Sequence, residues 1–110
     1  MTFKDYQEQA RRTQNENLTP REQLEHALWG LTSEVGEICG LYQKTHQGHF
    51  LDTSALRKEI GDALWFIAEL CDVCDFNMSY IAEENIAKLR KRYPDGFNVE
   101  NSLYRAKGDI

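Results

Sequence analysis

The sequence lacks the features of membrane, secreted and nucleic-acid-binding proteins. Its 110 residues contain no run approaching the roughly 20 apolar residues of a membrane span, and the N-terminal segment lacks the apolar core of a signal peptide. Three cysteines, an odd number, do not form a complete disulfide framework. The net charge is −5, and no basic run is long enough to attract nucleic acid through its phosphates. We therefore expect a cytoplasmic protein with reduced cysteines that binds neither membrane nor nucleic acid.

The chain has only two prolines, Pro20 and Pro94, and no stretch alternates apolar and polar residues as a β-strand does. Thr19, Pro20 and a glutamate at position 22 together are typical of a helix start. Apolar residues then recur every three or four positions, which indicates a helix of about six turns ending near residues 46–48. These residues are Leu24, Leu28, Leu31, Val35, Ile38 and Tyr42.

A second long helix is predicted to begin within residues 52–54, which offer capping side chains. Its apolar positions are Leu56, Ile60, Ala63, Leu64, Ile67, Cys71 and Cys74. Residues 63–71 are apolar on almost every side, with Glu69 as the exception. A helix of this kind is expected to be central and buried on more than one face.

Two shorter helices complete the prediction: one that Asn77 caps and that ends near Arg92, and a polar one within residues 3–16. We predict an all-α fold, a helical bundle of about four helices with two long central ones. Residues 1–110 form a single domain, and residues 98–110 are expected to be an irregular C-terminal arm. Because so small a domain exposes much of its surface, we expect oligomerisation to complete the bundle.

Four carboxylates form two matching pairs. Glu34 and Glu37 lie in the first long helix, and Glu59 and Asp62 lie in the second. A spacing of three places each pair on one helix face beside an apolar stripe, so packing the stripes together brings the pairs towards each other. Converging carboxylates repel unless a cation lies between them, and oxygen-only ligands favour Mg²⁺, with Mn²⁺ also possible. The alternative is that these acids lie on solvated faces and pair with neighbouring lysines or arginines.

Each acidic pair encloses a glycine, Gly36 or Gly61. A glycine inside a helix costs roughly 1 kcal/mol relative to alanine, so two in matching positions suggest that the helices approach closely. We predict that this approach occurs where the carboxylates meet. A di-iron site fits less well, because such sites use a Glu-x-x-His unit that neither acidic motif contains.

A zinc site is an alternative on paper. Cys71 and Cys74 have Cys-x-x-Cys spacing, and His46 and His49 could complete four ligands. Both cysteines lie on the apolar stripe of the second long helix, where small apolar side chains pack. We therefore interpret them as core residues, and His26 as a surface or interface residue.

The two acidic motifs are separated by 21 residues, and the pattern Glu-x-x-Glu followed by Glu-x-x-Asp resembles the signature of the MazG-like, all-α nucleoside triphosphate pyrophosphohydrolases. Other segments also look like single-domain members of that family, so the resemblance covers most of residues 3–97. These segments are residues 6–13, Glu59-Ile-Gly-Asp62-Ala-Leu-Trp, Asn85-Ile-Ala-Lys88-Leu and Arg92-Tyr93-Pro94.

The resemblance implies hydrolysis of a nucleoside or deoxynucleoside triphosphate between its α- and β-phosphates, which gives a monophosphate and pyrophosphate. The residues matching the family's metal ligands are Glu34, Glu37, Glu59 and Asp62. Magnesium would polarise phosphoryl oxygens and lower the pKa of a bound water. A carboxylate that the metal does not saturate could take the water's proton, and we expect this base to be Glu34 or Glu37.

Several polar residues could bind the phosphates. Asn85, Lys88 and Arg92 share one helix face, at spacings of three and seven. Lys44, about two turns beyond Glu37, is a further candidate. An ordinary solvated surface is the alternative for each of them.

Trp65, Phe66 and Tyr93 are the candidate base-binding residues, with core packing as the alternative. We expect a homo-oligomer, either a dimer or a tetramer. A phosphoribosyl-ATP pyrophosphohydrolase is the nearest alternative enzyme, because it shares the helical acidic pattern. A non-catalytic helical dimerisation or adaptor protein is the alternative from another class.

Overall fold

The computed structural model describes all 110 residues, 1–110, as a chain built from helices without strands. The elements are α1 (Phe3–Ala10), a 3₁₀ turn η1 (Arg11–Thr13), α2 (Pro20–Thr45), α3 (Thr53–Val73), α4 (Met78–Arg92) and α5 (Val99–Leu103). None of the helices is both long enough and apolar enough to cross a membrane. The predicted all-α class with two long helices is confirmed.

The helix starts follow the capping residues of the sequence. The Glu22 N–H donates to the Thr19 hydroxyl at 3.2 Å, and the Thr19 N–H donates to the Glu22 carboxylate at 3.0 Å. Asp52 accepts a hydrogen bond from the N–H of Ala55 at the start of α3, and Asn77 caps α4 in the same way. The reciprocal bonds at Thr19 and the single bonds at Asp52 and Asn77 satisfy N–H groups that have no partner within the helix, and the predicted starts are confirmed.

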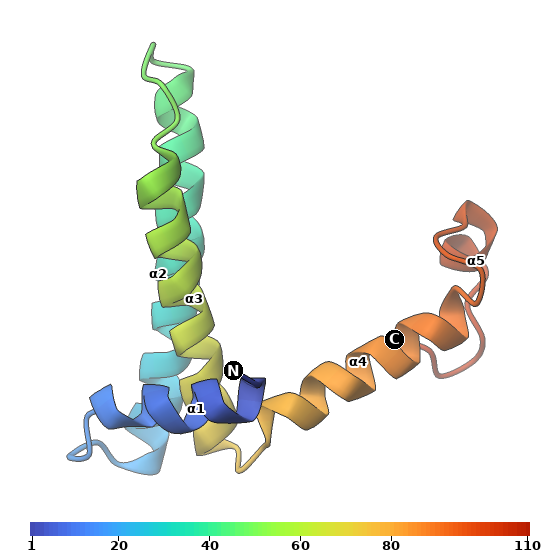
Figure 1. Cartoon of the computed structure of the whole chain (residues 1–110), viewed down its shortest axis with the longest axis horizontal. Helices are drawn as coiled ribbons and strands as arrows, with labels where there is room; N and C mark the ends of the chain where they lie inside the picture. The colour runs from blue at the N-terminus through green and yellow to red at the C-terminus, as the bar shows by residue number, and fades with distance from the viewer.

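The long helices α2 and α3 run side by side in opposite directions and form an upright hairpin, whose foot α1 crosses (Figure 1). At the foot, Asp75 adopts a left-handed backbone conformation, with φ of 57°, in the turn between α3 and α4. From that turn α4 leads away from the hairpin instead of packing along it (Figure 1). The helices therefore form an open arrangement within one chain.

A small apolar core lies at the foot of the hairpin. Its buried residues are Ala10, Ala68, Cys71 and Met78, with Tyr6, Leu64 and Trp65 packed against them. Cys71 is thus a core residue, as predicted, while Cys74 is half-buried at the end of α3. The histidines of the alternative zinc set, His46 and His49, lie between α2 and α3, at the end of the hairpin opposite the core. Because α3 is about 30 Å long, these cysteines and histidines cannot share one ion.

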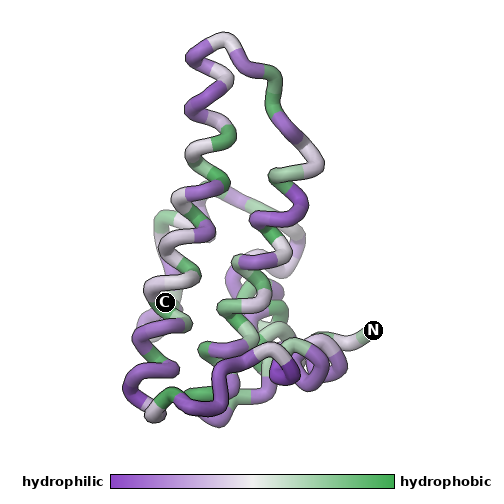
Figure 2. The backbone as a smooth tube through the Cα atoms, turned by 90° about the vertical axis from the view of Figure 1, so that its left-hand side faces the viewer, coloured by the Kyte–Doolittle hydropathy of each residue, from purple (hydrophilic) through white to green (hydrophobic).

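The apolar stripe predicted for α2 is only partly covered within one chain. Leu28, Val35 and Tyr42 on that stripe remain exposed, and Ala27 is the only buried residue of α2. Apolar and polar segments alternate along both helices of the hairpin (Figure 2). The chain exposes 8623 Å², whereas a compact protein of this mass exposes roughly 6,300 Å². Its radius of gyration is 17.3 Å, against about 13 Å for a compact domain of this length.

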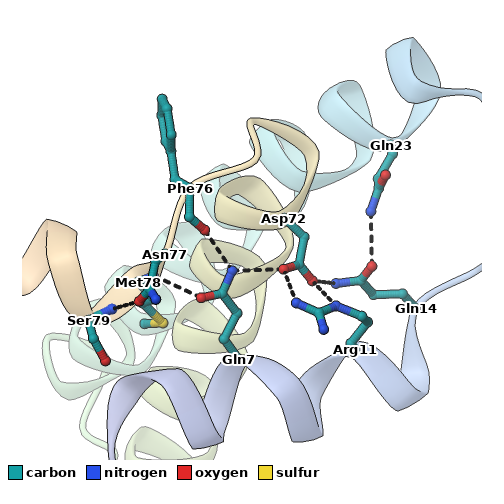
Figure 3. Close-up of polar contacts among 9 residues, drawn as sticks. All are labelled: Gln7, Arg11, Gln14, Gln23, Asp72, Phe76, Asn77, Met78 and Ser79. Atoms are coloured by element: carbon teal, nitrogen blue, oxygen red, sulfur yellow. Dashed lines mark hydrogen bonds and ion pairs between the residues drawn. The ribbon is translucent and has the colours of Figure 1, made fainter.

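Asp72 in α3 is the acceptor that fixes α1 and η1 to the foot of the hairpin (Figure 3). Its carboxylate accepts hydrogen bonds from Gln7 at 2.7 Å, Arg11 at 2.8 Å and Gln14 at 2.6 Å. Gln7 also accepts a hydrogen bond from the N–H of Met78 at 2.8 Å. One partly buried network therefore joins the N-terminal segment to α3 and to the start of α4.

The C-terminal arm, residues 98–110, is less irregular than predicted. It contains the short helix α5, which Asn98 caps. Beyond α5 the arm returns to α4, where Asp109 accepts two hydrogen bonds from the Arg92 guanidinium, at 2.8 and 2.7 Å. This bidentate ion pair holds the arm against the end of α4.

Candidate metal centre

Three carboxylates from the two long helices converge in the hairpin. The ligand atoms of Glu34 in α2 and of Glu59 and Asp62 in α3 all lie within 4.8 Å of one another. Glu34 and Glu59 are half-buried, and Asp62 is exposed. Antiparallel packing of α2 on α3 makes this convergence possible, because it places the middle of one helix beside the first half of the other. We refer to these three residues as the acidic group.

The carboxylates of the acidic group hinder one another's ionisation. A hydrogen bond with Glu59, together with partial burial and the charges of neighbouring carboxylates, raises the pKa of Glu34 from 4.5 to about 7. Carboxylates this close cannot all ionise without cost, so in the absence of a cation they share a proton. A divalent cation could take the place of that proton, and an all-oxygen set suits a hard ion.

Glu37, the fourth predicted ligand, lies one turn further along α2 and is not part of the acidic group. Its side chain is exposed. Its charge contributes to the raised pKa of Glu34, so it lies near enough to act on the group electrostatically. The structure thus brings together three of the four predicted metal ligands and leaves Glu37 beside them.

The prediction that Gly36 and Gly61 mark the close approach of the helices is wrong within this chain. A Cβ placed on either glycine would meet nothing within 4 Å. Each glycine lies two residues after a glutamate of the acidic group. Because two residues turn an α-helix by roughly 200°, each glycine lies on the side of its helix that faces away from the partner helix. The close approach is one turn before Glu34, where a Cβ on Gly30 would overlap the ring of Phe66.

The predicted phosphate ligands are not beside the acidic group in one chain. Lys44 is exposed in the last turn of α2. Asn85 and Lys88 are exposed on α4, which leads away from the hairpin (Figure 1). Arg92 is already paired with Asp109, and this hydrogen-bonded ion pair holds the pKa of the Asp109 carboxyl below its usual range.

The predicted base-binding aromatics fall into two places. The Trp65 indole N–H donates to the Thr13 hydroxyl at 2.8 Å and to the carbonyl of Ala10 at 3.2 Å, so Trp65 helps to anchor η1. The Phe66 ring lies at 5.1 Å from that of Trp65, between the helices of the hairpin. Tyr93, at the end of α4, packs against Phe97 with 5.5 Å between ring centroids. Trp65 and Phe66 both lie about one turn after Asp62 on α3, whereas Tyr93 lies on another helix.

Residues 22–97 match the MazG nucleotide pyrophosphohydrolase domain. The chain belongs to this family. It is also similar to the gene 37 protein of Mycobacterium phage L5, with 30% identity over 80 residues that cover 68% of this chain and 70% of the phage protein. No solved structure gives a significant match. The acidic group lies inside the matched MazG segment, and the resemblance predicted from the acidic motifs is confirmed.

A cavity of about 520 Å³ lies where the C-terminal arm meets α4 of the MazG domain. Its wall contains Lys88 and Arg92, two of the predicted phosphate ligands. The other cationic residues that line it are Lys91, Arg105 and Lys107. Asp109 is the only acid in the wall, and Arg92 neutralises it. This cavity, which we call the basic cavity, lies apart from the acidic group and suits an anion.

One polar pair of the MazG domain was missed by sequence reasoning. Glu69, the single acid in the apolar segment of α3, is fully buried, and its Oε1 lies 2.6 Å from Nδ1 of His26. His26 is exposed, as the interpretation of a surface residue requires, but its contact with a buried acid is not expected from the sequence. The signal for the pair was the acid itself, since a carboxylate inside an apolar run needs a partner.

Proposed function

We propose that this chain is a Mg²⁺-dependent nucleoside triphosphate pyrophosphohydrolase that produces a nucleoside monophosphate and pyrophosphate. The convergence of Glu34, Glu59 and Asp62 carries the proposal, because it places an oxygen-only donor set between the two long helices of a MazG domain. The raised pKa of Glu34 supports it, because carboxylates that hinder one another's ionisation are stabilised by a cation between them. Ribonucleoside and deoxyribonucleoside triphosphates are both candidate substrates.

The acidic group would hold the ion, with Glu37 available as a further ligand or as the base. Bound Mg²⁺ supplies charge to neutralise the phosphoryl oxygens and to lower the pKa of a water molecule. Glu37 is exposed and lies one turn from Glu34, so we assign it the role of taking the proton from the attacking water. Glu34 would be the base only if the ion left one of its oxygens free.

We further propose that a second copy of the chain completes the site. Leu28, Val35 and Tyr42 repeat every seven residues on α2 and are exposed, as are Ile60 and Ile67 on α3. Such a repeat is typical of a helix face that packs against other helices. A dimer or tetramer that covered this face would allow α4 of one copy to approach the acidic group of another. Asn85, Lys88 and Arg92 would then be placed to bind phosphates.

The test of the activity is release of pyrophosphate from a panel of ribonucleoside and deoxyribonucleoside triphosphates and phosphoribosyl-ATP, with Mg²⁺, with Mn²⁺ and with chelator. We expect turnover of at least one triphosphate that depends on the metal. Glu59→Gln should reduce kcat by at least a hundredfold, because it removes a charge from the acidic group while keeping the shape of the side chain. Glu84→Gln on α4 is the matched control and should retain activity.

Two results would contradict the proposal. One is the absence of turnover of every triphosphate by protein whose helicity is intact. The other is a melting temperature that Mg²⁺ leaves unchanged, since specific binding to the folded state must raise it. Turnover of phosphoribosyl-ATP alone would identify the alternative enzyme. Light scattering after size exclusion tests the assembly, and Val35→Glu should shift it towards a monomer.

A further inference from the structure

The basic cavity forms where the C-terminal arm folds back on the end of α4, away from the hairpin (Figure 1). Gly108, with φ of 85°, allows a tight turn in which the Asp109 N–H donates to the Ala106 carbonyl at 3.0 Å. This turn brings the Asp109 carboxylate to the Arg92 guanidinium, and the two side chains are only 17% and 9% exposed. The ion pair therefore holds the wall of the cavity together.

The other four cationic residues of the basic cavity have no acidic partner. They come from two separate segments: Lys88 and Lys91 from α4, and Arg105 and Lys107 from the arm. None of the four takes part in an ion pair, and all four are exposed. A ligand from solution can therefore reach them.

Only part of this positive charge is explained by the helix itself. Lys91 and Arg92 lie in the last turn of α4, where cations complement the helix dipole. The dipole does not explain why the arm adds Arg105 and Lys107 to the same cavity. The Arg92 hydrogen bonds hold the pKa of the Asp109 carboxyl below its usual range, and the charges of Arg92 and Arg105 lower it further. Positive charge from both segments thus converges on this cavity.

The charge and the size of the basic cavity indicate the class of its ligand. Five cationic residues and one acid give its wall a net charge of +4, in a chain whose net charge is −5. A single phosphate group carries roughly 1.5–2 negative charges near pH 7, so two or three linked phosphates match the wall better than one. The volume of about 520 Å³ lies within the range of small-molecule sites, roughly 300–1,000 Å³.

We propose that the basic cavity binds an oligophosphate, a chain of two or more phosphate groups, within one copy of the protein and without a metal ion. Pyrophosphate and the triphosphate chain of a nucleotide both supply this chemistry. Lys91, Arg105 and Lys107 are the ligands that this site adds to Lys88 and Arg92. The inference goes beyond the proposed function, because it needs neither the acidic group nor hydrolysis.

The test is calorimetric titration of the protein with pyrophosphate, in chelator and at constant ionic strength. We expect saturable binding that is at least tenfold tighter than that of orthophosphate. Arg105→Gln combined with Lys107→Gln should weaken pyrophosphate binding roughly tenfold, because two charged contacts are lost. Arg12→Gln combined with Lys4→Gln is the matched control: it removes the same charge from exposed residues of the N-terminal segment and should bind like wild type.

Tripolyphosphate and a non-hydrolysable deoxynucleoside triphosphate distinguish the two sources of the ligand. Equal affinities would support a site that contacts phosphates alone, and tighter binding of the nucleotide would support one that also contacts its sugar or base. The inference would be overturned by the absence of saturable pyrophosphate binding or by equal affinities for pyrophosphate and orthophosphate. Equal losses of affinity in the two double variants would overturn it as well, since they would reflect only the overall charge.

Glu59→Gln separates this inference from the proposed function. It alters the acidic group, so it should abolish hydrolysis, but it should bind pyrophosphate in chelator as wild type does. Protein that hydrolyses no triphosphate and still binds pyrophosphate through Arg105 and Lys107 would contradict the proposed function alone. Metal-dependent hydrolysis without pyrophosphate binding in chelator would contradict this inference alone.

Discussion

The backbone of Gly30 in α2 lies against the ring of Phe66 in α3 so closely that no Cβ fits between them. This contact sets the spacing of the hairpin one turn from Glu34 and one turn from Asp62. The distance between the two helices, and with it the convergence of the carboxylates, therefore depends on the absence of a single methyl group.

Gly30→Ala is expected to destabilise the protein by about 1–3 kcal/mol, because the new methyl group must displace Phe66 or separate the helices. Gly36→Ala is the matched control in the same helix. Its Cβ would meet nothing within 4 Å, so it should be neutral or should stabilise by up to about 1 kcal/mol through helix propensity. Urea unfolding measures both. Equal stabilities for the two variants would show that the contact at Gly30 does not constrain the hairpin.

Glu34 should make the stability of the metal-free protein fall as pH rises. Its folded-state pKa of about 7 lies above its ordinary value of 4.5, so the folded state binds more protons than the unfolded state between these values. The free energy of unfolding then decreases through that interval and levels off above about pH 7. Glu34→Gln removes this contribution and should be more stable than wild type at pH 8 in chelator, with the difference vanishing near pH 4.5.

The check is urea unfolding of both proteins in chelator across that pH range. Because other carboxylates titrate in both proteins, the difference between the two curves isolates Glu34. A difference that does not depend on pH would contradict the prediction. Adding Mg²⁺ at pH 8 should stabilise wild type more than Glu34→Gln, since the ion binds the deprotonated carboxylates.

Asp109→Asn should improve nucleotide binding if Arg92 contacts phosphate. The Asp109 carboxylate occupies the guanidinium in the bidentate manner that a phosphate group would use. Weakening this internal competitor is expected to lower KM by roughly three- to tenfold with little change in kcat. Asp95→Asn, which removes one charge near the end of α4, is the control. A KM that rises in Asp109→Asn alone would show that the arm helps to build the site.

Asp72→Asn is expected to cost about 1.5–3 kcal/mol of stability, because the charged acceptor of three side chains is replaced by an amide. Burial alone would raise the pKa of Asp72, but hydrogen bonds from Arg11, Gln7 and Gln14 lower it below its ordinary value. The stabilising contribution should therefore be present above that ordinary value and be lost as pH falls through the folded-state pKa. Urea unfolding at pH 7 and at pH 3 tests this, and a cost that persists unchanged at pH 3 would contradict it.

The helices were predictable because their signals are local. The Thr19–Glu22 capping box and the caps Asp52 and Asn77 each depend on residues within three positions of one another, and the structure contains them all. The acidic motifs were recognisable for the same reason, since spacing alone places Glu59 and Asp62 on one face.

What the sequence did not predict depends on contacts between helices. The importance of Gly30 follows from the position of Phe66 on another helix, and no local pattern distinguishes Gly30 from Gly36. The direction of α4 depends on the turn at Asp75 and on the surfaces left uncovered, so the distance of Lys88 from the acidic group could not be read from its spacing. Long-range polar pairs such as His26 with Glu69 require the register of α2 on α3.

The indole of Trp65, hydrogen-bonded to Thr13 and packed on the core, gives the protein a built-in optical reporter. The chain contains only one other tryptophan, Trp29, which is 68% exposed on α2. Release of the N-terminal segment should shift the emission of Trp65 towards longer wavelength, whereas assembly that covers the hairpin should shift that of Trp29 towards shorter wavelength. Replacing either tryptophan by phenylalanine would let the fluorescence of the other report separately on release of the N-terminal segment or on association of copies, without a label.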